Sequence, residues 1–398
     1  MIAAAVAALL YTLWLWKAVH RLPDVSRILR SLARPEVRKQ PPLPHLALFL
    51  VVFAGLLLFS PQVEAGLHLF LRLTLYLGTF LMLVCLRQLS PRYRRTRPVV
   101  HAILLGAVID AVYGLYQVHV TGQLHATGFG SHYTPFGSLL VTAILLATAL
   151  LLAARRPPRR AVYSGVVCVC AVALVCSQAR GPWIALAVSC PIVITLSRRR
   201  LARDRTRAVT YLGAAAALTV ALAPLYLGRL RTIFDPKWVS NSERILIWTS
   251  TLHMIRDHPL IGVGEGRFAA IYNAHYISRA SVEGWHPHAH NTFLMILAEN
   301  GIIGFAATLY LLYGIVLFLR AALRDAPSDP YVIGTVGVLC ALLVNSLVDY
   351  FLFSGHLRSE WVFWLMLGLV YYDRPAPRRP PAGDLTPQAA GCREKTLA

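Results

Sequence analysis

The residues best suited to chemistry in this sequence are the histidines of Trp285-His286-Pro287-His288-Ala289-His290-Asn291. They end the only long hydrophilic segment between apolar ones, which begins near residue 228 and carries six of the fourteen histidines. A neutral imidazole can accept a proton near neutral pH, as a general base must. His290 would lie at the first turn of a helix, whose dipole disfavours imidazolium. We therefore expect His290 to be the reacting group.

Alternating histidines also raise the hypothesis of a metal site, because imidazole is a good zinc ligand. No nearby carboxylate or cysteine completes a tetrahedral ligand set with His286, His288 and His290. We predict a site without metal or other cofactor, and keep a zinc-binding sensor as the alternative.

Arg180 is the first candidate for binding an anion. It lies in Ser177-Gln178-Ala179-Arg180-Gly181-Pro182, where Pro182 suits the first turn of a helix. A guanidinium beside the free N–H groups of a helix N-terminus can bind an anion. The simpler interpretation is that Arg180 contacts lipid phosphate at the membrane interface.

Arg244 is the second candidate. Ser240 and Glu243 have the spacing of a capping box, and apolar residues then recur at helical spacing until His258-Pro259. We expect an amphipathic helix on the membrane surface, with Arg244 and Trp248 on one face.

Three further residues are candidates for substrate binding. Gly262-Val263-Gly264-Glu265-Gly266 follows no strand, so it predicts a tight turn that presents Arg267 rather than a dinucleotide-binding fingerprint. Lys237 and Arg267 are expected to contact phosphate groups. Asn291 is expected to orient the histidine or to cap a short helix over 292–300, which Asn300-Gly301 would end.

Composition indicates the elements that must hold these residues. Hydrophobic residues make up 57% of 398 residues and charged residues 14%, too few polar groups to coat a soluble domain. Apolar runs long enough to cross a bilayer recur along the chain. The predicted fold is an all-α polytopic membrane protein with about 11–12 transmembrane helices and one large loop. The eleven predicted spans are 1–19, 43–60, 66–86, 98–120, 135–154, 161–177, 182–197, 208–227, 301–320, 330–350 and 359–372.

The distribution of charge predicts which side of the membrane the loop faces. Of 39 Lys and Arg residues, 28 fall in one set of alternating loops and nine on the opposite side, which includes the hydrophilic segment. Positive residues stay cytoplasmic, so the segment with Arg180, Arg244 and His290 should face outward. The net charge of +21 thus reflects topology and attraction to anionic lipid rather than nucleic acid. None of the seven cysteines lies in the outward loop, which argues against a disulfide framework.

Four regions follow from this topology: transmembrane helices over 1–227, a large loop with the active site over 228–300, transmembrane helices over 301–372, and a cytoplasmic tail over 373–398. Within the first, Arg72 and Asp110 are expected to form a structural ion pair or to line a polar cavity. The short outward loop 121–134, with His125 and His132, could border a site.

These motifs together resemble the O-antigen ligases. That family carries His-Asn/Ser/Gln, nine residues, then Gly-x-x-Gly, and His290-Asn291 followed by Gly301-Ile302-Ile303-Gly304 fits this pattern. It also has an Arg-Gly pair after a Ser-rich span end, similar to Arg180-Gly181, and an arginine shortly before a tryptophan, similar to Arg244 and Trp248. Family members commonly have twelve spans with both ends cytoplasmic; a missing upstream helix would account for the eleven predicted.

The resemblance implies an inverting, metal-independent glycosyltransferase of a Gram-negative inner membrane. It would transfer O-antigen polysaccharide from undecaprenyl pyrophosphate to a sugar hydroxyl of lipid A–core, on the periplasmic side and without an obligate protein partner. His290 would be the base, and Arg180 and Arg244 would bind the pyrophosphate. An O-antigen polymerase or a protein O-oligosaccharyltransferase are the alternatives with the same donor. A transporter, with Arg72, Asp110 and Asp349 along its path, is the alternative of another class.

Overall fold

The computed structural model describes residues 40–61, 63–89, 97–198, 227–228, 231–232, 235–354 and 358–373. These residues form helices and connecting loops and contain no strand, which confirms the predicted all-α class. The spans predicted at 1–19 and 208–227 (Leu227 apart), and the tail from residue 374, lie outside the described residues.

The helices coincide with the predicted spans. Five are long and apolar enough to cross a membrane: α5 (Val63–Leu89), α6 (Arg97–His119), α7 (Tyr133–Ala153), α8 (Pro157–Ser177) and α14 (Thr292–Asp325). Three shorter apolar helices, α4 (Leu43–Leu58), α9 (Arg180–Leu196) and α15 (Pro330–Ser346), fall on predicted spans, as does α16 (Arg358–Asp373). The hydrophilic segment contains α12 (Val239–Asp257), the short α13 (Phe268–Ile271) and a π-helical turn, η2 (Tyr272–Tyr276).

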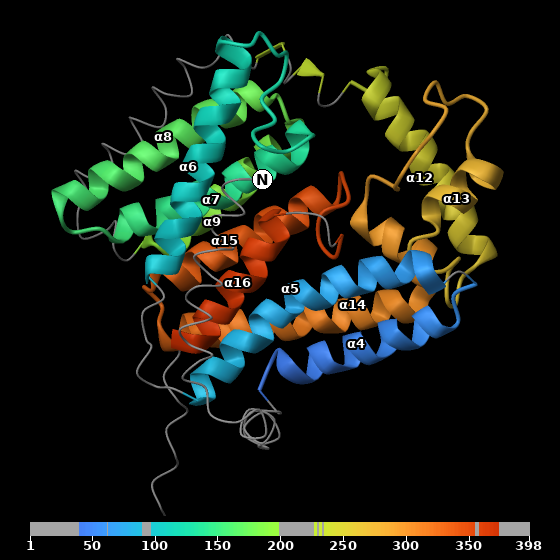
Figure 1. The fold of residues 1–398 in the computed structure, drawn as a ribbon, viewed down its shortest axis with the longest axis horizontal. Coiled ribbons are helices and arrows are strands. Elements are labelled where there is room, and N and C mark those ends of the chain that lie inside the picture. The colour runs from blue at the N-terminus through green and yellow to red at the C-terminus, as the bar shows by residue number, and fades with distance from the viewer. Residues whose placement is uncertain are drawn as a thin grey trace, which may run out of the picture.

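Side chains of the apolar helices are hydrophobic on both the inner and the outer faces. α15 packs on α7 and α9, α16 on α5, and α14 on α4, as Figure 1 shows. Trp364 and Phe80 are buried inside, whereas Val51, Leu75 and Leu105 are 69%, 69% and 59% exposed. Helices that are apolar all round require an apolar surrounding, so this exposed surface is typical of a multi-pass membrane protein.

One predicted ion pair is wrong. Asp110 is buried and pairs with Arg358 Nη1 at 3.0 Å instead of with Arg72, and its other carboxylate oxygen accepts the Phe129 N–H at 2.7 Å. Arg72 is the nearer candidate partner of Asp110 in the sequence, because the two residues lie in neighbouring spans. In the folded chain, however, the start of α16 places Arg358 beside Asp110 on α6, and the loop at Phe129 binds the same carboxylate. This carboxylate therefore fixes the loop before α7 to a distant helix, which matters because that loop leads into the site.

Helix α14 changes direction at Gly301, as the Asn300-Gly301 pair predicted. Gly301 has φ +59° and ψ −165°, and the segment 259–264 crosses the helix at this break. The N–H groups of Val263 and Gly264 donate to the carbonyls of Ala298 and Glu299, both at 2.9 Å. The N–H of Ile302 in turn donates to the Pro259 carbonyl at 2.9 Å. Backbone groups left without partners at the break are thus satisfied by the crossing segment.

Glycines allow this crossing. A Cβ at Gly301 would collide with the backbone of Leu260, and one at Gly262 would collide with the backbone of Glu299. A Cβ at Gly304 would collide with the Asn300 side chain, whose amide donates to the buried Glu265 carboxylate. The Gly-x-x-Gly spacing therefore has a packing reason: one glycine admits the crossing backbone and the other admits the asparagine.

Helix α12 packs against α14. Its residues Ile247 and Met254 form a separate apolar cluster with Phe268 of α13 and Tyr272 of η2. The capping box predicted for it is wrong. Trp238 is the N-cap residue and provides no side-chain hydrogen bond. Ser240 instead accepts a hydrogen bond from Arg180, and Glu243 accepts two from the 281–282 loop, because tertiary partners compete for both side chains.

Candidate active site

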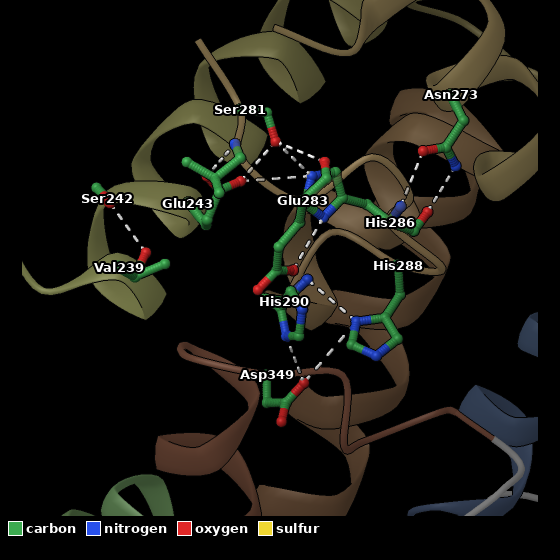
Figure 2. A network of polar contacts seen from close by, with 11 residues as sticks. Val239, Ser242, Glu243, Asn273, Ser281, Glu283, His286, His288, His290 and Asp349 are labelled. Carbon is green, nitrogen blue, oxygen red and sulfur yellow. Dashed lines mark hydrogen bonds and ion pairs between the residues drawn. The ribbon is translucent and has the colours of Figure 1, made fainter.

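His290 is joined to Asp349, a residue that the chain places 59 positions away. His290 Nδ1 lies 3.1 Å from Asp349 Oδ1 (Figure 2), and both side chains remain partly exposed, 27% and 16%. Asp349 follows α15 in a short irregular stretch, and its carboxylate also accepts the Tyr350 N–H at 2.9 Å. The pair therefore connects the end of the hydrophilic segment to the end of a transmembrane helix.

The start of α14 fixes the backbone at His290. Asn291 is the N-cap, and its side-chain oxygen accepts from Phe293 N–H and Leu294 N–H at 2.9 and 3.1 Å. Its amide nitrogen donates to the Leu347 carbonyl at 3.0 Å. Asn291 thus caps the helix, as predicted, and at the same time ties it to the loop of Asp349. His290 itself precedes the cap with φ +48°, a conformation that few non-glycine residues adopt.

Asp349 is an ionised hydrogen-bond acceptor in this arrangement. Burial raises the pKa of its carboxyl, but the hydrogen bond from His290 and the charges of His290 and His288 outweigh burial and lower the pKa to about 2. A carboxylate at Nδ1 selects the tautomer in which Nδ1 carries the proton. His290 Nε2 is then left with a lone pair that can accept a proton, the requirement for a general base.

His288 lies beside this pair as a neutral ring. Its ring centroid is 4.2 Å from that of His290, and its Nδ1 accepts the His290 N–H at 3.3 Å. Burial and the neighbouring His290 lower the pKa of His288 to about 4. His288 therefore supports the backbone of His290 without adding charge at neutral pH.

The rest of the histidine segment is held by α12 and η2 (Figure 2). His286 N–H donates to Asn273 Oδ1 at 2.8 Å, and the Asn273 amide donates back to the His286 carbonyl at 2.8 Å. Ser281 donates to Glu243 Oε2 at 2.6 Å and lies 3.0 Å from His286 Nε2. Burial raises the pKa of the Glu243 carboxyl, but the hydrogen bonds that Ser281 and Val282 donate outweigh burial, and the pKa is lowered overall. The carboxylate is therefore an ionised acceptor. This network fixes the segment from one side.

Trp248 fixes the segment from another side. Its indole N–H donates to the Ala289 carbonyl, immediately before His290, at 3.0 Å. Trp248 and Arg244 lie one turn apart on α12 and line the same cavity, as their spacing predicted. The position of His290 and that of Arg244 are therefore set by one helix.

Arg180, Arg244 and Asp349 line one common cavity. Its other lining residues include Tyr133 and Thr134 at the start of α7 and Ser240 on α12. A second, larger cavity of about 270 Å³ also has Arg180 and Arg244 in its wall, and here the lining is otherwise mostly apolar. The structure thus brings the two predicted arginines together at the carboxylate that holds His290.

The two arginines differ in how they are held. Arg180 is the first residue of α9, and it donates from Nη1 to the Thr232 carbonyl at 2.7 Å and from Nη2 to Ser240 at 2.9 Å. Arg244 makes no hydrogen bond or ion pair with any residue that the structure describes. A half-buried guanidinium without a protein partner needs an anion or water to satisfy its donors.

The remaining predicted residues lie elsewhere. Lys237 is exposed next to Pro236, which lines the larger cavity. Arg267 lines a separate cavity near the end of α4. Of the predicted loop 121–134, the last two residues, Tyr133 and Thr134, line the cavity and begin α7, and the charge of Asp349 acts on the preceding His132.

Three residues of the described chain could hold a metal ion. His288, His290 and Asp349 each offer one ligand atom, all within 4.8 Å of one another. The carboxylate that the sequence argument found missing is therefore supplied from a distant position. The positive charge of Arg244 acts on His288, which disfavours a second cation at the same place.

The sequence alone does not identify Asp349 as the partner of His290 and predicts it only as a charge along a transport path. Its signal is a single carboxylate at the end of an apolar span, and nothing in the spacing of 59 residues identifies His290 as its partner.

The fold and the site define a multi-pass, all-α membrane protein with a histidine–aspartate pair beside a cavity that two arginines line. Residues 165–309 match the family model for O-antigen ligase. The matched region is similar to that family and includes Arg180, Arg244, His290 and the Gly-x-x-Gly pair. Asp349 lies beyond the matched residues. A comparison with curated proteins finds no match.

Proposed function

We propose that this protein transfers O-antigen polysaccharide from undecaprenyl pyrophosphate to a sugar hydroxyl of lipid A–core at the periplasmic face of the inner membrane. The single observation that carries the proposal is the unpartnered guanidinium of Arg244, which shares a cavity with Arg180 and with the carboxylate that holds His290. The family match supports ligase or polymerase chemistry in general. The choice of donor, acceptor and membrane face rests on the resemblance and on the charge distribution.

The larger cavity has the chemistry that a lipid-linked pyrophosphate requires. Arg180 and Arg244 supply positive charge, and Ile184, Ile245 and Trp248 supply apolar surface in the same wall. The N-terminus of α9 adds free backbone N–H groups beside Arg180. A pyrophosphate would contact the arginines while the first isoprene units of its lipid lie against the apolar residues.

The proposed reaction is a single displacement at the anomeric carbon. His290 Nε2 takes the proton of the acceptor hydroxyl, and the hydroxyl oxygen forms the new bond to the sugar. The bond from the anomeric carbon to the pyrophosphate oxygen breaks, undecaprenyl pyrophosphate leaves, and the configuration inverts. Arg180 and Arg244 stabilise the negative charge that develops on the leaving group. Removing one such electrostatic contact typically slows a reaction by roughly 10²–10³-fold.

The test is complementation of a smooth-lipopolysaccharide host that lacks its own ligase. The unmodified protein should restore the O-antigen ladder on a lipopolysaccharide gel. His290→Ala and Arg244→Ala should abolish it while undecaprenyl-linked polymer accumulates. His275→Ala and Arg256→Ala, exposed residues of the same segment, are the matched controls and should retain the ladder.

Each other result has a definite meaning. A full ladder with His290→Ala would disprove the role of His290, provided that the variant inserts at the normal level. Failure of the unmodified protein, together with longer lipid-linked polymer or glycan attached to protein, would indicate a polymerase or a protein O-oligosaccharyltransferase. Transfer by purified protein should persist with chelator present; its loss would mean that His288, His290 and Asp349 hold a metal.

A further inference from the structure

A third cavity lies where the turn between α4 and α5 meets the loop that crosses the break in α14. Its volume is about 170 Å³, and Ser60, His258 and Arg267 are the polar or charged side chains in its wall. It shares no lining residue with the cavities at Arg180 and Arg244. Figure 1 shows the α4–α5 turn beside α13, away from the end of α15 where Asp349 follows.

Two polar groups of this cavity lack partners within the described chain. Ser60 is 7% exposed and its hydroxyl has no hydrogen bond, and the buried Nε of Arg267 has none either. Arg267 donates only from Nη1, to the Val263 carbonyl at 3.2 Å. Buried donors without acceptors are costly, so a ligand with several acceptor oxygens would satisfy this site.

Neighbouring carboxylates do not neutralise Arg267. Glu265 is two residues away, but its carboxylate accepts a hydrogen bond from Asn300. Glu299 accepts the Phe268 N–H at 2.9 Å. Burial raises the pKa of Glu265 to about 7, which further reduces the negative charge near Arg267. The guanidinium therefore faces the cavity with its positive charge unpaired within the described chain.

Exposed apolar residues contribute to the wall of this cavity. Phe59 and Ile261 line it and are 73% and 43% exposed, and their chain neighbours Leu58 and Leu260 are 78% and 64% exposed. An arginine and a hydroxyl framed by exposed apolar side chains match the interface of a bilayer, where phosphate headgroups lie above acyl chains. A free anion would need no such apolar frame.

We propose that this cavity binds the phosphate group of a membrane lipid through Arg267 and Ser60. The acyl chains would lie against Leu58, Phe59 and Ile261. The bound lipid would join the α4–α5 turn to the loop that crosses α14, because Ser60 and Arg267 belong to these two segments. This site is independent of the proposed transfer reaction.

The experiment is lipid binding to the full-length protein in detergent, measured by native mass spectrometry after delipidation. The probes are phosphatidylglycerol, diacylglycerol with the same chains, and inorganic phosphate. The protein should retain one phosphatidylglycerol far more tightly than diacylglycerol. Arg267→Gln should weaken its binding roughly tenfold or more and Ser60→Ala about fivefold, the effect of losing a charged and a neutral hydrogen bond. Arg279→Gln, an exposed arginine outside the cavity, should bind as the unmodified protein does.

Ser60→Asp tests the site without removing the arginine. Its carboxylate would pair with Arg267, so the variant should fold but lose the phosphatidylglycerol. Equal binding of diacylglycerol, or normal phosphatidylglycerol binding by both Arg267→Gln and Ser60→Asp, would overturn the proposal. Inorganic phosphate binding as tightly as phosphatidylglycerol would reassign the site to a free anion. The transfer assay is run separately, so failure of either proposal leaves the other standing.

Discussion

His290 has a left-handed backbone conformation that histidine seldom adopts, with φ +48°. Strain of this kind costs about 1–3 kcal/mol and persists only where surrounding contacts hold it. Here the helix cap at Asn291, the hydrogen bond to His288 and the contact with Asp349 all act on one residue. Three separate residues thus hold one imidazole in place, which is typical of a functional group rather than of a surface histidine.

Asp349→Asn should leave the shape of the site intact but remove its selection of the imidazole tautomer. An amide can donate to His290 Nδ1, which would place the ring proton on Nε2 and block proton acceptance there. We expect transfer by purified protein to fall by roughly 10²–10⁴-fold, the typical contribution of a general base. Undecaprenyl pyrophosphate release is the measurement, and Asp257→Asn, an exposed aspartate, is the control. Undiminished transfer by Asp349→Asn would show that the carboxylate does not act through His290.

His288 predicts a pH dependence of stability. Its pKa is lowered from 6.5 to about 4, so between these values the unfolded chain binds more protons than the folded protein does. Its contribution is therefore fully present above pH 6.5 and is lost as the pH falls toward 4. Glu265, whose pKa is raised to about 7, contributes with the opposite sign, so only a comparison with a variant isolates His288.

The comparison is between the unmodified protein and His288→Asn, whose amide oxygen can still accept the His290 N–H. The unfolding temperature of both is measured in detergent at about pH 7 and about pH 5. The unmodified protein should lose more stability on acidification than the variant does. Equal losses would mean that His288 titrates in the same way folded and unfolded.

At the scale of the elements, the break in α14 connects the hydrophilic segment to the apolar helices. The backbone of 259–264 occupies the space at Gly301 and Gly262 and exchanges hydrogen bonds with α14 on both sides of the break. The hydrophilic segment is thus held at the break, while its end carries His290 just before the start of the same helix. Movement at the break would displace the start of α14 and the histidine with it.

Gly301→Ala should therefore destabilise the protein strongly. The methyl group would collide with the Leu260 backbone, and alanine disfavours φ +59°. A loss of about 2–4 kcal/mol is expected from strain and collision together. Thermal unfolding in detergent measures it. Gly284→Ala, at an exposed position with no atom near the added Cβ, should have an effect below about 1 kcal/mol. Comparable unfolding temperatures for the two variants would contradict the packing explanation of Gly-x-x-Gly.

The helices were predictable from sequence because burial in a membrane imposes long apolar runs whose ends coincide with charges and prolines. Nine of the eleven predicted spans fall on described helices. Tertiary partners were not predictable. Asp110 pairs with Arg358 and Glu243 binds the 281–282 loop, because packing rather than spacing determines which charged groups meet. The arginine pair and His290 were found through motifs, whereas Asp349 was missed because its partner is distant in sequence.

At the scale of the whole molecule, the proposed site can function only if three parts lie on one side of the membrane: the hydrophilic segment, the start of α9 and the end of α15. The helices satisfy this condition: Arg180 begins α9, Asp349 follows α15, and both line the cavity with Arg244. The opposite ends carry positive residues, such as Arg155 to Arg160 at the start of α8 and Arg320 with Arg324 at the end of α14. The charge distribution therefore predicts a periplasmic site.

Cysteine labelling tests this orientation. In a background without native cysteines, Gly284→Cys in the hydrophilic segment and Ala326→Cys between α14 and α15 are treated with a membrane-impermeant maleimide. Cells with a permeabilised outer membrane should be labelled at position 284 and not at 326, and 326 should react only after lysis. The reverse pattern would place His290 in the cytoplasm. Because O-antigen joins lipid A–core on the periplasmic side in the proposed reaction, that result would rule out the proposal even if the fold and the arginine cavity were correct.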